Sequence, residues 1–428
     1  MKKKNIAIVG LGNIGSYLFK YLNKNKKILT EKNNCTPIIS HVSAKNRNIK
    51  RNIKIKKGQW VDNYLDPTKN RNVDIIVELI GGAEGPAKKL VFEALRNKKH
   101  VVTANKALIA KYGDELAKIA EINKVNLEFE AAVCGGVPIV RSLKEGLIAN
   151  KISKIYGIFN GTSNYILSTM DKKNINFKNV LKDAKKLGYA EANPTADLNG
   201  DDVAAKLKIL SSLCFNSFLN HNIYVEGITD IDQNDIDNAN KFGYKIKLLG
   251  YAELINNIIY QRVHPTLIRK SSFVASIDGV LNAVIVDGSP VGQSTIQGEG
   301  AGPAATTSAL VSDISSILRG NIKFPFSLSL KERKKLLFSN INNRLFSGYL
   351  RFDVLDKPGV LSNITNVFSK NKVSIKRLVQ DPVKGKKSSM ITIITHNAKN
   401  DYLIKILKEI SKKNYIKKKP KLIRIDEN

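Results

Sequence analysis

Residues 5–15 read NIAIVGLGNIG, and this stretch decides the fold of the N-terminal part of the chain. Residues 5–10 form a short apolar run of the kind that makes a buried strand. A helix is predicted directly after it, because Ile14, Leu18 and Leu22 fall on one face at a 3.6-residue period. The glycines between the two match GxGxxG in the strand–turn–helix context that this motif requires.

Each glycine of the motif has a physical role in binding a dinucleotide. Gly10 allows the tight turn, Gly12 lets a pyrophosphate approach the backbone, and Gly15 lets helix and strand pack closely. The phosphates would lie at the helix N-terminus, where backbone N–H groups are free. The alternative is a glycine-rich turn in some other α/β domain. The predicted cofactor-binding residues of this loop are Gly10, Leu11, Gly12, Asn13, Ile14 and Gly15.

The end of the second predicted strand, residues 37–42, bears on the choice of cofactor. A site that prefers NAD usually has Asp or Glu there to bind the ribose 2′-hydroxyl. Residues 43–47 read SAKNR and contain no carboxylate. Lys45 and Arg47 could instead hold a 2′-phosphate, so the sequence favours NADP, or use of both cofactors. The alternative is that they are two of the 70 basic residues of the chain.

Three further predicted strands, residues 73–79, 100–103 and 125–130, alternate with helices. This order indicates a doubly wound parallel sheet, in which ligands bind at the carboxyl ends of the strands. Thr103 and Lys106 follow such an end. Lys106 is either the N-terminal residue of a surface helix or a cation at the edge of the nicotinamide.

Length and composition restrict the class of protein. A chain of 428 residues predicts two or three domains. The net charge is +33, but the lysines are spread along the chain and no basic–aromatic interleaving suits nucleic acid. No apolar run approaches the ~20 residues of a membrane span, and the apolar part of MKKKNIAIVG is too short for an export signal. We therefore expect a cytoplasmic protein that binds neither nucleic acid nor membrane.

The three cysteines support that expectation. Cys35, Cys134 and Cys214 are odd in number and show no CxxC spacing. This pattern fits reduced cytosolic thiols and predicts no cysteine metal site.

A second unit is predicted after residue 130. Residues 130–138, EAAVCGGVP, indicate a tight connection where backbones come close together. Segments 153–158, 262–264 and 283–286 could form the sheet of this unit. Residues 297–303, QGEGAGP, predict a second glycine-rich loop before a helix at 304–318, and this loop is either a cofactor contact or a flexible connector.

Residues 191–206, EANPTADLNGDDVAAK, combine carboxylates with a helix. Val203, Leu207 and Leu210, with Cys214, define one apolar helical face. Asp197 or Asn199 could supply the N-cap oxygen.

Asp202 and Lys206 are four residues apart in this helix, so their side chains meet on one face. A lysine held beside carboxylates next to an apolar stripe could hold and move a proton. The alternative is an ordinary surface salt bridge worth only ~0.3–0.5 kcal/mol.

The C-terminal part reads as a separate unit after a linker rich in basic and polar residues at 321–345. From residue 346 the predicted order of elements is βαββαβ, which indicates a ferredoxin-like module. Its turn at residues 356–360, DKPGV, precedes a helix and is a natural site for a small ligand.

Six motifs, in this order, resemble the homoserine dehydrogenase family of the monofunctional kind, and the C-terminal unit resembles an ACT regulatory domain. The motifs are GLGNIG (10–15), VTANKALIA (102–110), EAAVCGGVPIV (130–140), NGTSNYIL (160–167), the stretch 191–206, and GEGAGPAATTSALVSD (298–313).

The resemblance implies a fold of three parts. The first is an α/β nucleotide domain with a Rossmann doubly wound parallel sheet at 1–130. The second is an α+β catalytic and dimerisation domain at 131–320, whose segment 298–318 returns to the nucleotide domain. The third is an ACT domain with a ferredoxin-like fold at 346–428. It also implies at least a homodimer, or a homotetramer, and feedback inhibition by threonine at the turn after residue 355.

The implied reaction is the reversible interconversion of L-homoserine and L-aspartate 4-semialdehyde with NAD(P). The resemblance makes Lys206 the acid–base, with its pKa lowered toward neutrality, and Asp202 the group that orients it. Glu191 would hold the substrate ammonium and Asp197 would also bind substrate. Lys106 would lie by the nicotinamide, and Gly302 would touch the cofactor.

A structural monovalent cation, Na⁺, is also implied. Its ligands would be the Glu130 carboxylate and the backbone carbonyls of Val133, Gly135 and Val137. Two alternatives stay open from the sequence: a related amino-acid dehydrogenase, and a sensor that binds a dinucleotide and an amino acid without turnover.

Overall fold

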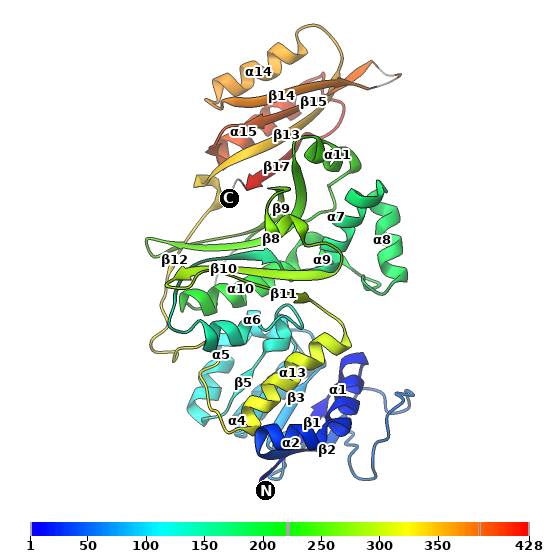
Figure 1. Cartoon of the computed structure of the whole chain (residues 1–428), viewed down its shortest axis with the longest axis vertical. Helices are drawn as coiled ribbons and strands as arrows, with labels where there is room; N and C mark the ends of the chain where they lie inside the picture. Colours follow the sequence, from blue (N-terminus) through cyan, green and yellow to red (C-terminus); the bar gives the residue numbers. More distant parts are fainter. Residues whose placement is uncertain (1, 220–222, 384, 386, 427–428) are drawn as a thin grey trace.

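The computed structural model describes residues 2–219, 223–383, 385 and 387–426 of the chain. The molecule is elongated, with three parts stacked along its long axis (Figure 1). The first strands and helices lie at one end, a large mixed sheet lies in the middle, and the last 80 or so residues lie at the other end.

The N-terminal part is a five-stranded parallel sheet. Its strands are β1 (Lys2–Val9), β2 (Cys35–Ser43), β3 (Ile75–Glu78), β4 (His100–Thr103) and β5 (Leu127–Glu128), in the order β2-β1-β3-β4-β5. The predicted doubly wound sheet is therefore confirmed, with its strand order reversing between β1 and β3.

Helices cover both faces of this sheet. On one face lie α4 (Pro86–Arg96) and α5 (Lys106–Asn123), and on the other lies α1 (Asn13–Lys24). The late helix α13 (Pro303–Leu318) returns along the molecule to pack beside α1 (Figure 1). The smaller helices here are α2 (Lys26–Asn33) and α3 (Asp66–Lys69).

The middle part is built on antiparallel strands in the order β11-β10-β6-β8-β9. Their bounds are β6 (Lys151–Ile158), β8 (Tyr244–Ile255), β9 (Ile258–Arg269), β10 (Leu281–Ser289) and β11 (Gly292–Glu299). The three predicted segments of this sheet are confirmed. The prediction of a loop from residue 297 is wrong for its first residues, which end β11 as an exposed edge strand.

One face of this sheet is covered by α10 (Asp201–Phe215) and by α7 (Gly161–Lys173). The other helices of this part are α6 (Ile139–Arg141), α8 (Phe177–Lys186), α9 (Thr195–Asn199), α11 (Gln233–Lys241) and α12 (Phe273–Ser276).

The C-terminal part has the predicted βαββαβ order. Its elements are β13 (Leu345–Leu355), α14 (Val360–Lys370), β14 (Ile375–Pro382), β15 (Ser388–Thr395), α15 (Asn400–Ser411) and β17 (Lys421–Asp426). β17 pairs with β13 on one side and, in parallel, with β9 on the other, so the sheet runs on into the middle part.

Segment 321–345 is packed rather than free. Phe326 is buried against Phe129, with ring centroids 5.2 Å apart, and the buried Arg333 forms an ion pair of 2.7 Å with Asp114. The short strand β12 (Leu337–Ser339) then pairs with β9. The other short strands are β7 (Tyr224–Val225) and β16 (Ala398–Lys399).

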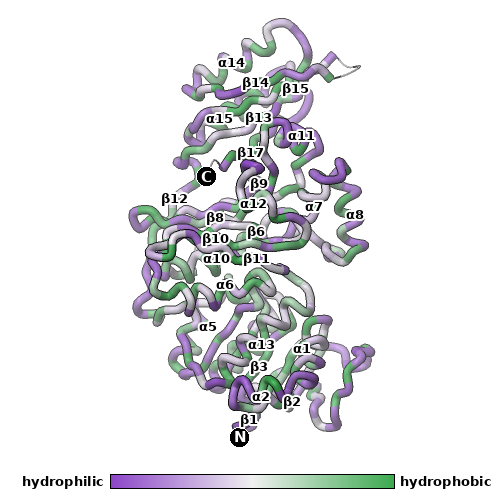
Figure 2. The backbone as a smooth tube through the Cα atoms, in the orientation of Figure 1, coloured by the Kyte–Doolittle hydropathy of each residue, from purple (hydrophilic) through white to green (hydrophobic). Residues whose placement is uncertain are grey.

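Hydrophilic residues are spread along the whole chain rather than gathered in one region (Figure 2). In the part of the chain that the structure describes, no helix has the length and apolar character needed to cross a membrane.

Candidate active site

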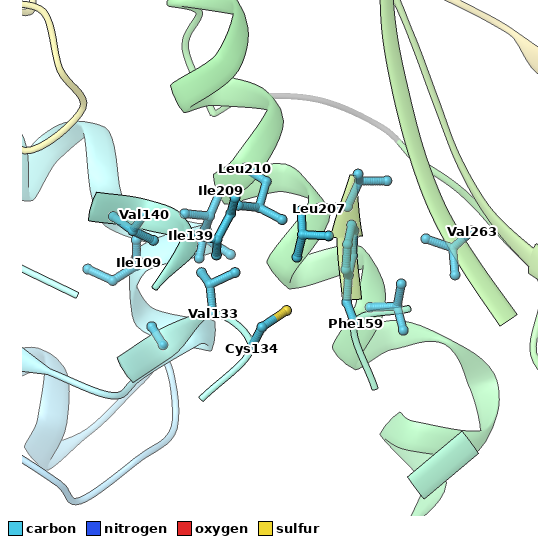
Figure 3. Close-up of a cluster of buried hydrophobic side chains, with 14 of the residues drawn as sticks. Ile109, Val133, Cys134, Ile139, Val140, Phe159, Leu207, Ile209, Leu210 and Val263 are labelled. Carbon is cyan, nitrogen blue, oxygen red and sulfur yellow. The ribbon is translucent and has the colours of Figure 1, made fainter. Parts of the chain in front are cut away.

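Helix α10 places the central charged residues of the site. The predicted face of Val203, Leu207, Leu210 and Cys214 is buried. The prediction of an Asp197 or Asn199 N-cap is wrong, because those residues form the separate turn α9. That turn ends at Gly200, whose φ of +90° lets the chain start α10 without a side-chain cap. Figure 3 shows the core around α10, where Leu207, Ile209 and Leu210 gather with Val133, Cys134 and Phe159.

Two lysines bind one buried carboxylate, that of Asp202. The Nζ atom of Lys206 lies 2.7 Å from Oδ2, and that of Lys106 lies 2.7 Å from Oδ1. Asn160 donates to Oδ2 from 2.9 Å. Burial would raise the pKa of Asp202, but the two ammonium groups outweigh burial and hold this pKa below its usual value. The structure thus brings together three of the residues that the sequence singled out.

Lys206 is almost fully buried, with 9% of its side chain exposed. Its Nζ also donates to the backbone oxygen of Phe159 at 2.6 Å. Burial alone would lower the pKa of Lys206, but the attraction of the acidic groups around it, Asp202 first among them, together outweighs burial and raises this pKa. The expectation of a lowered pKa is therefore wrong for this structure, and Lys206 is an ammonium ion at neutral pH.

The other two predicted substrate residues lie differently from each other. Asp197 accepts a hydrogen bond from Asn160 at 2.7 Å, and burial followed by repulsion from Asp202 raises the pKa of Asp197. Asn160 therefore donates to both carboxylates at once. Glu191 is exposed and joins no ion pair or hydrogen bond among residues 2–219, 223–383, 385 and 387–426.

A groove of about 1430 Å³ lies at the carboxyl ends of β1 and β2. Nothing lies within 4 Å of where a Cβ of Gly12 would be, so a pyrophosphate has room beside the start of α1. A Cβ on Gly15 would lie 2.0 Å from the Gly10 oxygen, which is the close packing predicted for it. The predicted residues that line this groove are Gly10, Leu11, Gly12, Asn13, Lys45 and Arg47.

The remaining predicted cofactor residues do not line the groove. Ile14, in the first turn of α1, packs against the hydrophobic core, and Lys106 forms an ion pair with Asp202. Gly302 precedes Pro303, which does line the groove at the start of α13. The shape and the glycine loop fit a dinucleotide that extends from α1 toward α13.

Thr103 supports the loop after β3 instead of facing the groove. Its hydroxyl donates to the buried Glu78 at 2.6 Å. The other oxygen of Glu78 accepts from the N–H groups of Ile80 and Gly81, at 2.7 and 2.9 Å. Sequence reasoning missed Glu78, although a carboxylate at the end of a buried strand was a usable signal.

Arg51 is a second residue that sequence reasoning missed. Its Nε donates to the oxygen of Leu11 at 3.0 Å, and its Nη1 to those of Arg47 and Ile49 at 3.2 and 2.9 Å. Arg51 therefore joins the glycine loop to the segment that carries Lys45. Because the chain has so many basic residues, no sequence pattern distinguishes Arg51 from the rest.

The loop after residue 130 has the close approach that its composition predicted. A Cβ on Gly135 would lie 2.5 Å from the Gly300 oxygen. Both oxygens of Glu130 accept backbone hydrogen bonds, from Val140 at 2.9 Å and Arg141 at 2.6 Å. Burial nevertheless raises the pKa of Glu130 to about 7. Across the described residues, no group of three His, Cys, Asp or Glu side chains could hold a metal ion, so a cation here would depend on carbonyl oxygens.

Comparisons with protein families assign all three parts. Residues 10–130 match the NAD-binding domain of homoserine dehydrogenase, residues 138–315 match homoserine dehydrogenase, and residues 350–418 match an AHAS small subunit-like ACT domain.

Whole-chain comparisons agree. A homoserine dehydrogenase from Neisseria gonorrhoeae is 38% identical over all of this chain and 99% of its own length, and one from Helicobacter pylori is 38% identical over the full length of both. The solved structure of a homoserine dehydrogenase from Thiobacillus denitrificans is 36% identical, covers 100% of this chain and 99% of that one, and has a TM-score of 0.91. These matches exclude both alternatives left open by the sequence, and the chain belongs to the homoserine dehydrogenase family.

Proposed function

We propose that Lys206 is the acid–base of the homoserine dehydrogenase reaction and that Asp202 holds it in place. The observation that carries this proposal is that one N–H bond of the Lys206 ammonium group has no partner among the residues that the structure describes. An ammonium ion has three N–H bonds, and Asp202 and Phe159 take two of them. The third is left for the substrate oxygen.

The proposed proton path follows from that arrangement. The bound nicotinamide supplies the hydride that reduces the aldehyde carbon. Lys206, protonated at neutral pH, donates its proton to the oxygen on which negative charge develops, and so leaves a hydroxyl group. In the reverse direction the neutral amine of Lys206 removes the hydroxyl proton. Lys106, half-exposed and paired with Asp202, adds positive charge near that oxygen.

We assign substrate binding to Glu191 and Asp197 on the resemblance of their motif. Asp197 is supported by its place beside Asn160 and Asp202. Glu191 is supported only by its position in the sequence, and its exposure leaves it free to meet a substrate ammonium.

The test of the main proposal is turnover of aspartate 4-semialdehyde, followed as NADPH consumption, by wild type, Lys206→Met and Lys208→Met. Lys208 is on the same helix but makes no contact with Asp202. We expect Lys206→Met to lose about a hundredfold or more in kcat and Lys208→Met to stay within about twofold. Retention of most of the activity by Lys206→Met would contradict the assignment.

For the cofactor, we propose a preference for NADP, with Lys45 and Arg47 on the 2′-phosphate. Both side chains are exposed on the rim of the groove, and β2 ends without a carboxylate. Arg47→Ala is expected to raise KM for NADPH about tenfold and to leave KM for NADH unchanged. Equal effects on the two cofactors would refute this role.

We also propose a Na⁺ ion held by the Glu130 carboxylate and the carbonyls of Val133, Gly135 and Val137. The burial of Glu130 supports it, because burial raises the pKa of this carboxyl in spite of Arg141 and Lys144, and a bound cation would favour the ionised form. If so, replacing Na⁺ by choline at constant ionic strength lowers the melting temperature. An unchanged melting temperature would remove the proposal.

Several broader expectations remain proposals of the same kind. We propose domain boundaries at 1–130, 131–320 and 346–428, with a linker at 321–345. We also propose that threonine inhibits the enzyme by binding at the turn after β13. The enzyme is proposed to form a homodimer or homotetramer and to be located in the cytoplasm. Three free, buried cysteines support the last. Sedimentation and a threonine titration of wild-type turnover test the oligomer and the inhibition.

A further inference from the structure

A polar cavity of about 280 Å³ lies where the ACT unit joins the middle sheet. Its walls come from β9, from the start of β13 and from β17. The cavity is separate from the dinucleotide groove. It is also roughly 30 Å along β13 from the turn proposed for threonine, given a rise of about 3.3 Å per residue.

Three arginines line the cavity, and two of them are already paired. Arg424 is buried, and its guanidinium donates hydrogen bonds of 2.7–2.9 Å to Glu226, Tyr224 and Asn400. Arg344 forms an ion pair with Glu253. These two side chains add positive charge to the cavity, but their N–H groups already bind protein partners.

Arg262 differs from both. Its guanidinium lies 3.6 Å from the ring centroid of Tyr251 and 5.1 Å from that of Phe346. Among the residues that the structure describes, no hydrogen bond or ion pair involves this guanidinium. Stacking on rings uses the faces of the group and leaves its edge N–H bonds, which suit a planar carboxylate.

His264 supplies the opposite kind of unpaired group. Its side chain is 2% exposed, and its Nδ1 lies 2.9 Å from the oxygen of Pro265, so Nδ1 carries the proton and donates it. Its Nε2 is then an acceptor, and within the described part of the chain it has no hydrogen-bond partner. Burial, with repulsion from Arg424 and Arg262, lowers the pKa of His264 and keeps the ring neutral.

We propose that this cavity binds a small carboxylate that carries a hydroxyl or an ammonium group next to the carboxylate. The carboxylate meets the free edge of Arg262, and the neighbouring donor meets Nε2 of His264. Such a ligand satisfies an unpaired donor and an unpaired acceptor at the same time. Because β9 and β17 both form the walls, the ligand bridges the catalytic and ACT sheets.

The test uses three molecules with one carbon skeleton: propionate, L-lactate and L-alanine. Each is titrated by calorimetry into the wild-type enzyme. We expect L-lactate or L-alanine to bind at least about tenfold more tightly than propionate, which lacks the donor for His264. Which of the two binds better tells whether the natural ligand is a hydroxy acid or an amino acid. No heat of binding from either at 50 mM, a concentration of the order expected to saturate even a weak millimolar site, would overturn the proposal.

Two variants locate the binding. Arg262→Met keeps an apolar side chain against Tyr251 and is expected to weaken binding of the preferred ligand by at least about tenfold. Arg269→Met removes an exposed arginine at the end of the same strand and is expected to change nothing. Both variants are expected to keep wild-type turnover, which shows that they fold. Equal affinity in wild type and Arg262→Met would place the ligand elsewhere and overturn the proposal.

Discussion

The buried Asp202 is the residue on which the charge balance of the site depends. It holds Lys206 in the ammonium form, which suits reduction of the aldehyde at neutral pH. In the proposed mechanism, oxidation of homoserine requires the neutral amine of Lys206 instead. Because the pKa of Lys206 is raised, the oxidation rate should increase with pH through the alkaline range, up to that pKa.

Asp202→Asn removes the charge that raises the pKa of Lys206. The neutral amine then forms at lower pH, so the alkaline limb of kcat/KM for homoserine oxidation is expected to move down by at least about one pH unit. The matched control is Asp201→Asn, an exposed residue next in sequence that makes no contact with Lys206. An unmoved limb in Asp202→Asn would show that another group titrates.

Asn160→Asp is predicted to act in the opposite direction. An aspartate there can still cap α7, as the Oδ1 atom of Asn160 does by accepting from Ser163. It loses the amide that donates to Asp197 and Asp202, and it adds a negative charge that raises the pKa of Lys206 further. We expect an alkaline limb shifted to higher pH and a loss of about tenfold or more in kcat.

The control for Asn160→Asp is Asn176→Asp, which changes the equivalent cap of α8 on the surface. It should leave both the pH profile and kcat unaltered. If Asn160→Asp lowered kcat without moving the limb, Asn160 would be a purely structural residue.

At the scale of elements, the loop 130–137 packs in close backbone contact against the segment that leads into α13. Gly135 has a φ of +53°, and its missing Cβ leaves room for the Gly300 oxygen. Gly136 also donates its N–H to the oxygen of Glu299 at 3.0 Å. This crossing ties the loop 130–137 to the helix that returns to the nucleotide sheet.

Gly135→Ala is expected to destabilise the enzyme by about 2 kcal/mol or more, because it combines a left-handed backbone with a contact of 2.5 Å. Gly146→Ala is the control, since it has no heavy atom within 4 Å of the new Cβ and no positive φ. Thermal unfolding compares the two, and similar melting temperatures would disprove the steric argument.

Local sequence patterns predicted those elements whose residues carry a periodic or steric signal. The apolar run before Gly10 and the face of Val203 and Leu207 were correct because burial imposes a period on the sequence. The double donation by Asn160 and the bond from Thr103 to Glu78 join residues 25 or more positions apart. Such contacts have no local pattern. The pKa of Lys206 was misjudged for a related reason, since it depends on the balance between burial, which lowers it, and the attraction of nearby acidic groups such as Asp202, which raises it.

At the scale of the whole molecule, the ACT unit is docked through buried charge as well as through the sheet. Arg351 of β13 is 4% exposed and lies between Asp232 and Asp235 at the start of α11. Asp235 is fully buried, and burial raises its pKa to about 6 in spite of Arg351. The ion pairs of Arg351 with Asp232 and Asp235 therefore join the two units through buried charge.

Arg351→Met is expected to destabilise the protein by about 3–5 kcal/mol, because it leaves Asp235 as a buried charge without its cation. Without Arg351 the pKa of Asp235 rises above about 6, so the variant takes up a proton at a higher pH than wild type does, and the loss should shrink as the pH falls toward about 6. Chemical unfolding at pH 5 and pH 8 measures both effects. Lys408→Met, an exposed change on α15, serves as the control, and a loss that does not vary with pH would contradict the account.

The edge of β9 that does not pair with β8 is covered by three separate strands. β12 pairs with its first residues, β7 with its centre, and β17 with Thr266–Ile268 near its end. β17 is the last of these three to leave the ribosome, some 155 residues after the strand it covers. Until then the newly made chain presents an open strand edge of the kind on which other chains can pair. We therefore expect a chaperone that binds nascent chains to protect this enzyme most during that interval.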